Sequence, residues 1–225
     1  METDSYLFES IIQNLKNSET RLKTDKAIKK YYKEVFFNIK NLRIFNAIML
    51  EALKGEIRTP LYGFMSKEQE RQGETISEVG FNLLIKMNKL GFLTDDSQFG
   101  QGIPGVDEDN AVQRSYVGGF LPKKFITKGL HFKNFIFLRT PLLEKENSGG
   151  MNKSDIWVTG FNTHFPIKIP SDIHVLAMYL NEDLWIELYK NYDYCFFCDP
   201  IWGNPSNGPN GLFTQLISHL ESLVE

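Results

Sequence analysis

The hydrophobic pattern of this chain changes period at Gly91, and this change restricts the folds that it can adopt. Before Gly91, apolar residues recur every three or four positions, as in amphipathic helices. After it, apolar residues gather in short β-branched and aromatic runs between turn residues, as in strands. With no internal repeat, this order predicts an α+β fold, with a mostly antiparallel sheet from the C-terminal half packed against helices of the N-terminal half.

The clearest predicted helix directly precedes Gly91. Thr75 and Glu78 have the spacing of a capping box, in which each side chain accepts a hydrogen bond from the other residue's backbone N–H. Gly91 stands where a left-handed C-terminal cap is required. The buried stripe of this helix is expected to consist of Ile76, Val79, Leu83, Leu84, Met87 and Leu90.

Two other helical patterns lie nearer the N-terminus. The first covers residues 7–15 and has Thr3 and Asp4 as candidate caps. The second covers residues 25–54. It fits either one long helix or two helices with a break at residues 38–41, and the pattern does not decide between them.

The length of 225 residues suits one large domain or one domain with a helical appendage. We divide the chain into a helical N-terminal segment, residues 1–55, and an α+β core domain, residues 56–225. The segment is expected to pack on the core and to unfold with it as one cooperative domain.

The second half of the chain carries the strand signals. Four runs are predicted as strands: residues 134–139, 156–160, 173–179 and 194–199. Asn181 is expected to cap a short helix between the last two runs, and a final helix is expected after Gly211. Residues 92–120 hold five glycines among polar residues, so part of this segment is expected to be a long loop.

Composition excludes several classes of protein. Hydrophobic residues make up 42% and charged residues 24% of the chain, as in globular domains. The net charge of −3, with one basic run at residues 21–43, gives no clear nucleic-acid signal. The acidic N-terminus is not a secretory signal, and no apolar stretch approaches the roughly 18–20 residues that span a bilayer. We therefore expect a cytoplasmic protein with no membrane partner.

The motifs associated with metals and cofactors are weak. Cys195 and Cys198 form a lone CxxC in a predicted strand, where alternation places the two thiols on opposite faces. Buried, inert thiols are the favoured interpretation, and redox or metal chemistry is the less favoured alternative. The glycine-rich run at residues 100–105 lacks the GKS or GKT ending of a phosphate-binding loop. No metal and no cofactor are predicted.

The best candidate site pairs two polar segments on either side of the glycine-rich excursion. If the chain returns on itself there, their hydrogen-bonding groups converge. Arg114 would supply a planar fork suited to a carboxylate or phosphate, and Gln98 and Gln113 could both donate and accept. The alternative is that Gln98 and Arg114 bind loop backbone and hold the excursion in place. The candidate ligand-binding residues, including two at the expected edge of the site, are Thr94, Ser97, Gln98, Gln113, Arg114, Tyr116, Asp199 and Trp202.

Several of these residues belong to a wider pattern that covers roughly residues 50–220. The pattern consists of Leu90-Gly91-Phe92-Leu93-Thr94, Ser97-Gln98 with Gly100, Gln113-Arg114-Ser115-Tyr116 with Gly118 and Phe120, and Asp199-Pro200-Ile201-Trp202-Gly203. It resembles an uncharacterised α+β domain family of bacteria and large DNA viruses, which has no established activity. The family has proline after the Ser-Gln pair, whereas this chain has Phe99. The resemblance implies a shared fold and a shared site at Ser97, Gln98, Gln113 and Arg114.

Two functions of different classes fit the sequence. The first is a small-ligand-binding or catalytic pocket around residues 94–120 that recognises a polar or anionic group. The second is a non-enzymatic protein-interaction domain that uses an aromatic and basic helical face, with Tyr31, Phe36, Phe37 and Phe45. A homodimer through the N-terminal helices is a further expectation for exposed apolar residues there. No reaction or ligand identity follows from the sequence, so whether the protein is an enzyme stays open.

Overall fold

The computed structural model describes residues 2–21, 38–54, 78–101, 113–127, 134–142, 157–159 and 180–224. These residues form six helices and one five-stranded sheet, which confirms the α+β class. The helices are α1 (Glu2–Arg21), α3 (Leu42–Leu53), α5 (Glu78–Lys89), α6 (Lys123–Thr127), α8 (Glu182–Asn191) and α9 (Leu212–Val224). The strands are β1 (Leu93–Gln101), β2 (Gln113–Pro122), β3 (Ile136–Pro141), β4 (Trp157–Thr159) and β5 (Tyr192–Trp202).

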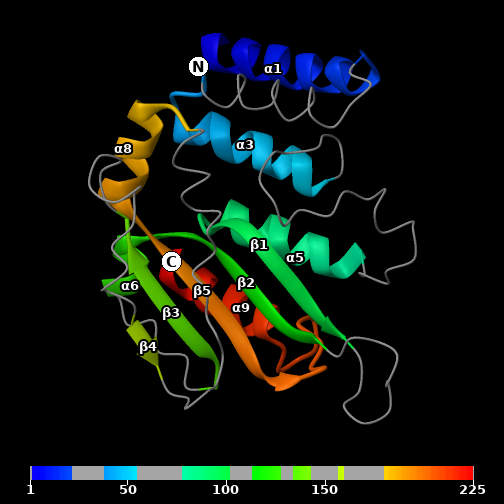
Figure 1. Ribbon diagram of the computed structural model, residues 1–225, viewed down its shortest axis with the longest axis vertical. Helices are drawn as coiled ribbons and strands as arrows, with labels where there is room; N and C mark the ends of the chain where they lie inside the picture. Colours follow the sequence, from blue (N-terminus) through cyan, green and yellow to red (C-terminus); the bar gives the residue numbers. More distant parts are fainter. Residues whose placement is uncertain are drawn as a thin grey trace.

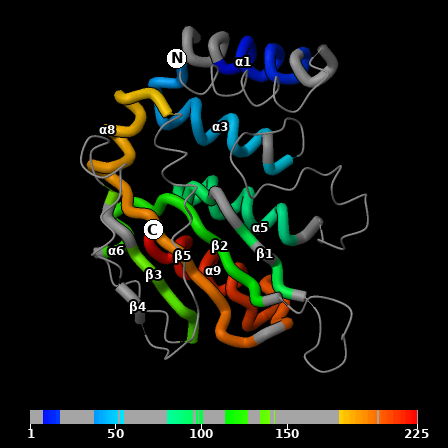
Figure 2. Tube along the Cα trace, viewed as in Figure 1, coloured from blue at the N-terminus to red at the C-terminus, as the bar shows by residue number. Residues whose placement is uncertain are grey.

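The sheet is antiparallel throughout its described part. Its strand order is β1-β2-β5-β3-β4, so β5 lies at the centre although it is last in the sequence. Helix α9 lies behind β2 and β5, whereas α1, α3 and α8 lie beyond one end of the sheet (Figure 1). The N-terminus lies at this helical end, and the C-terminus lies beside the sheet (Figure 2).

Side chains of β5 alternate between two hydrophobic cores. Cys195 and Phe197 belong to the core that contains α5 and α9. Tyr194 belongs to the core that contains α1, α3 and α8, and Phe196 packs against it. Because successive residues of a strand face opposite sides, one strand can join both cores. The first core also holds Val117, Leu121, Phe213, Leu216 and Leu220, and the second also holds Leu15, Phe45, Phe120, Trp185 and Leu188.

The predicted cap at the end of α5 is confirmed in detail. Gly91 has φ +96°, the left-handed backbone that glycine adopts without strain. Its N–H donates to the carbonyl of Asn88 at 3.1 Å, and the N–H of Phe92 donates to the carbonyl of Met87 at 3.0 Å. This pair of hydrogen bonds is the Schellman motif. The capping box expected at the start of this helix includes Thr75, which lies outside the described residues.

The helices nearer the N-terminus differ in one respect from their expected starts. Helix α1 already includes Thr3 and Asp4, so these residues do not precede it as caps. For residues 25–54 the sequence left one helix or two open; residues 38–41 are not helical and α3 begins after them, so one helix does not span the range, and residues 25–37 lie outside the described residues. Asn41 accepts hydrogen bonds from the N–H groups of Arg43 (2.8 Å) and Ile44 (3.4 Å), as an N-cap residue does.

Two strands that the sequence did not indicate, β1 and β2, take up most of residues 92–120, part of which was expected to be a long loop. The glycines of β2 allow close approach between neighbours in the sheet. A Cβ on Gly118 would overlap the Tyr194 hydroxyl, and one on Gly119 would overlap the backbone of β1. At Gly118 and Gly119 the lack of a side chain thus serves packing within the sheet. Residues 102–112 of the expected excursion lie outside the described residues.

The remaining predicted elements are confirmed where the structure describes them. Strand β5 covers the run at 194–199, whereas β3 and β4 overlap the runs at 134–139 and 156–160 in part. The run at 173–179 lies outside the described residues. Asn181 caps α8 and accepts from the N–H of Asp183 at 2.9 Å. The inward residues of the two C-terminal helices are buried as expected: Leu184, Trp185, Leu188, Leu212, Phe213, Leu216, Ile217, Leu220 and Leu223.

Candidate functional site

The two polar segments singled out in the sequence lie side by side in the sheet. Strands β1 and β2 pair antiparallel, with Gln98 opposite Tyr116 and Gln101 opposite Gln113. The expected return of the chain is thus confirmed for the backbone. On its other side β2 pairs with β5, which places Arg114 opposite Trp202. Residues from three strands therefore meet at one end of the sheet.

Tyr116 occupies the middle of a row that crosses these three strands. Its register partners are Gln98 on β1 and Cys198 on β5. Arg114 lies two residues earlier on β2, beyond a register shift between Arg114 and Tyr116. Such irregularities bend a strand and re-aim its side chains, and they are frequent near functional sites.

Arg114 is half-buried and electrostatically close to β5. Burial raises the pKa of the Cys198 thiol from 9.0 to about 11, while the charge of Arg114 lowers it and that of Asp199 raises it. The guanidinium therefore lies near enough to the thiol for its charge to act there. A partly buried cation interacts more strongly with an anion than one in bulk water.

Tyr116 and Phe196 form an aromatic pair next to Arg114. Their rings are stacked, with centroids 5.2 Å apart and an interplanar angle of 28°. Both rings are half-buried. Gly118 lies directly opposite Phe196, and a Cβ there would be in contact with Phe196 Cδ2 at 3.4 Å and would overlap the Tyr194 hydroxyl.

Thr94 has a structural role that accounts for both of its polar groups. Asn88 Nδ2 donates to Thr94 Oγ1 at 2.6 Å, and the Thr94 N–H donates to Asn88 Oδ1 at 3.2 Å. Asn88 also donates to the carbonyl of Leu84 at 2.9 Å. The side chain of Asn88 thus ties the end of α5 to the start of β1, and we leave Thr94 out of the site.

Asp199 closes the turn that follows β5. Its Oδ1 accepts from the N–H of Ile201 at 2.8 Å, and its Oδ2 accepts from Asn204 Nδ2 at 2.6 Å. The residue is 1% exposed, so this carboxylate is committed to the turn. Ser97 is half-buried opposite Val117. The structure gives the strand positions of Gln98, Gln113 and Trp202 but does not describe their side chains.

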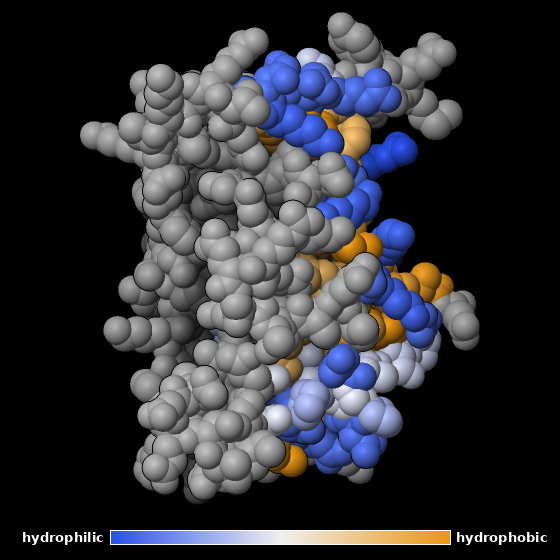
Figure 3. All heavy atoms as spheres, turned by 90° about the vertical axis from the view of Figure 1, so that its right-hand side faces the viewer, coloured by the Kyte–Doolittle hydropathy of each residue, from blue (hydrophilic) through white to orange (hydrophobic). Residues whose placement is uncertain are grey.

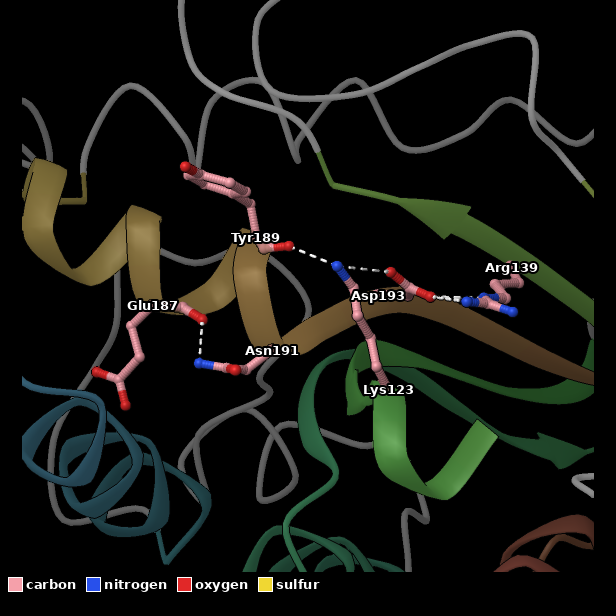
Figure 4. A network of polar contacts seen from close by, with 6 residues as sticks. All are labelled: Lys123, Arg139, Glu187, Tyr189, Asn191 and Asp193. Atoms are coloured by element: carbon pink, nitrogen blue, oxygen red, sulfur yellow. Dashed lines mark hydrogen bonds and ion pairs between the residues drawn. The ribbon is translucent and has the colours of Figure 1, made fainter. Parts of the chain in front are cut away.

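A second polar cluster lies at the other end of β5, and the sequence did not indicate it. Asp193 is fully buried, and its Oδ2 accepts from Arg139 Nε at 2.5 Å. Lys123 Nζ lies 3.8 Å from Asp193 Oδ1 and donates to the carbonyl of Tyr189 at 2.7 Å. Figure 4 shows the carboxylate between the two cations, with the lysine reaching back to α8.

This cluster joins α6, α8, β3 and β5. Near it, Asn191 Nδ2 donates to the carbonyl of Glu187 at 3.1 Å (Figure 4). The Glu187 carboxylate in turn accepts from the N–H of Leu42 at the start of α3, at 3.3 Å. The polar groups mainly satisfy one another and the ends of helices, so the cluster is a structural tie. Arg139 and Asp193 lie 54 positions apart, and nothing local in the sequence pairs them.

The two cysteines are buried free thiols, as expected. Burial raises the pKa of Cys195 well above its ordinary value, with a further increase from Asp193. Cys195 faces the α9 side of the sheet together with Phe197. Within the part of the chain that the structure describes, no group of three or more His, Cys, Asp or Glu residues could hold a metal ion.

One residue of the aromatic face proposed for a protein partner, Phe45, is buried and cannot contact a partner. Phe45 is 1% exposed and belongs to the hydrophobic core that contains α1, α3 and α8. Tyr31, Phe36 and Phe37 lie outside the described residues. On the side seen in Figure 3, the described residues are mostly hydrophilic, with hydrophobic ones in small groups between them.

Comparisons with known proteins identify no relative. Neither the scan against models of protein families nor the search of curated proteins gives a match to this chain. Among the described helices, none is long and apolar enough to cross a membrane. The function must therefore be argued from the site itself.

Proposed function

We propose that the protein binds a small ligand with a polar or anionic group at the end of the sheet where Arg114 lies. The observation that supports this most is the position of Arg114. Arg114 is a half-buried residue on β2, between β1 and β5, and its charge acts on Cys198 of β5. Ser97, Gln98, Gln113 and Tyr116 are the other proposed contact residues.

The chemistry of arginine suits this role. The guanidinium carries five N–H donors in a fixed plane and stays charged at any physiological pH. Nε and Nη1 of Arg114 are buried, which leaves Nη2 to donate a charge-assisted hydrogen bond to a carboxylate or phosphate. The glutamines on either side would add donors and acceptors, which would favour ligands that carry both.

The resemblance described above points to the same segments. It implies a shared site at Ser97, Gln98, Gln113 and Arg114, and these residues lie on the adjacent strands β1 and β2. Asp199 is not a proposed contact, because its carboxylate is occupied by its turn.

A thermal-shift screen against phosphates, carboxylates, nucleotides and amino acids tests this proposal. A ligand at 100 times its Kd stabilises the protein by about 2.7 kcal/mol. For a domain of this size the melting temperature should then rise by roughly 5–10 °C. Arg114→Gln should abolish the shift, whereas Arg43→Gln, which removes an exposed arginine from α3, should preserve it. A shift that persists in Arg114→Gln would refute the assignment.

A further inference from the structure

We infer that the ligand is planar: an aromatic or heteroaromatic ring that bears an anionic group. This inference rests on the proposed function and specifies the ligand of the same site. It is carried by the position of the stacked Tyr116–Phe196 pair beside Arg114. Tyr116 and Arg114 are two residues apart on β2, so one ligand could contact both the tyrosine ring and the guanidinium.

The aromatic pair is the outer end of a strip that starts in the core. Phe120 and Tyr194 are buried, and their rings meet edge to face with centroids 5.7 Å apart. The hydroxyl of Tyr194 occupies the space over Gly118, and Phe196 lies beside it. From there Phe196 stacks on Tyr116, which is half-buried. The outermost ring is thus supported from within.

A supported ring is a good surface for another ring. Because its position is fixed by the core behind it, little side-chain freedom is lost when a ligand stacks on it. Aromatic pairs gain from offset-stacked or edge-to-face contact beyond the area that they bury. Loss of one such contact should weaken binding roughly three- to tenfold.

The charges around the strip favour an anion over a cation. The charge of Arg114 acts on Cys198, which is the register partner of Tyr116. The neighbouring carboxylate of Asp199 is held by Ile201 and Asn204 and is 1% exposed. The charge that a ligand on Tyr116 meets is therefore that of the Arg114 guanidinium, which favours an anionic group on the ligand.

Three probes separate the two features of the ligand: benzoate has a ring and an anion, acetate has the anion alone, and benzyl alcohol has the ring alone. Binding is followed by amide chemical shifts in NMR titrations at constant ionic strength. Benzoate should bind at least about three- to tenfold more tightly than acetate or benzyl alcohol. Its shifts should be largest in β2 and β5.

Variants identify the residues responsible. Tyr116→Leu should weaken the binding of benzoate by about three- to tenfold and leave the binding of acetate unchanged. Tyr116→Phe should bind benzoate as the parent protein does. Arg114→Gln should weaken the binding of both benzoate and acetate. Tyr189→Leu removes a half-buried tyrosine ring from α8 and should change neither. The Tyr116→Phe variant keeps the test valid even if Tyr116→Leu folds poorly.

The outcomes distinguish this inference from the proposed function. Equal binding of benzoate and acetate, both weakened in Arg114→Gln, would overturn the planar ligand while the proposed function stands. Binding of benzoate that is unchanged in Tyr116→Leu would also overturn it. If neither anion binds and no ligand of the thermal-shift screen depends on Arg114, both proposals are wrong.

Discussion

Arg139 holds the buried carboxylate of Asp193 with two atoms, because Nε and Nη2 both lie 2.5 Å from Oδ2. The aspartate side chain is fully buried, whereas that of the arginine is 34% exposed. A carboxylate without contact with water needs a cation and hydrogen-bond donors nearby to remain charged. Arg139 provides both from the neighbouring strand, which links β3 to the start of β5.

Arg139→Met should therefore destabilise the fold. It leaves Asp193 buried with only Lys123 at 3.8 Å, so we expect the free energy of unfolding to fall by about 3 kcal/mol. Urea denaturation measures this loss. Lys86→Met is the control, because it breaks the exposed ion pair with Glu221 and should cost less than about 1 kcal/mol. Equal losses in both variants would contradict the role of Arg139.

The tie between α5 and β1 gives a second prediction. Asn88→Ala removes three hydrogen bonds and leaves the buried Thr94 hydroxyl and N–H without their partner. Unsatisfied buried groups are costly, so stability should fall by about 2–3 kcal/mol in urea denaturation. Asn82→Ala, at an exposed position of the same helix, should change stability by about 0.5 kcal/mol or less. A neutral Asn88→Ala would show that this tie contributes little.

Gly91 and Gly208 allow a matched test of backbone strain. Gly91→Ala should cost about 1 kcal/mol, because alanine is strained at φ +96°. Space is not the cause, since the nearest atom to the added Cβ, on Phe125, would be 3.7 Å away. Gly208→Ala places its Cβ at a similar 3.6 Å from the carbonyl oxygen of Pro205, at a position without positive φ. It should be nearly neutral, and a larger loss there than at Gly91 would contradict this account.

These examples also show what the sequence could predict. The cap at Gly91 and the cap of α8 at Asn181 depend on residues within a few positions, so local pattern was sufficient. Helix stripes and most strands followed from hydrophobic period in the same way. The Arg139–Asp193 pair depends on which strands are neighbours in the sheet, and β5 enters between β2 and β3 from far along the chain.

The candidate site was predicted in part for the same reason. Polar residues on two segments suggested convergence, and antiparallel pairing brings the segments together. The glycines suggested a loop for part of the segment. Composition does not show that Gly118, within a strand, accommodates Tyr194. Nor does a polar side chain reveal its partner: Thr94 and Asp199 were expected to face a ligand, and they are bound by Asn88 and by the turn after β5.

The last prediction concerns Cys198 and its neighbour Arg114. The folded-state pKa of Cys198, about 11, is above its ordinary value of 9.0. Folding therefore favours the protonated thiol: the associated stability is fully present below pH 9 and is lost as the pH rises through about 11. The loss should be at most about 2–3 kcal/mol, since one pKa unit corresponds to about 1.4 kcal/mol.

Urea denaturation between pH 8 and pH 10.5 tests this, with Cys198→Ala as the reference for all other titrating groups, including Tyr192, whose pKa burial also raises. The parent protein should lose more stability than Cys198→Ala as the pH rises. The effect of Arg114 is read from the thiolate absorbance of the folded protein as a function of pH, which Arg114→Gln should shift to higher pH, because without its charge the pKa of the thiol rises further. A pH dependence that is unchanged by Arg114→Gln would place the guanidinium too far from Cys198 to act on it, and would remove the main support for the proposed ligand site.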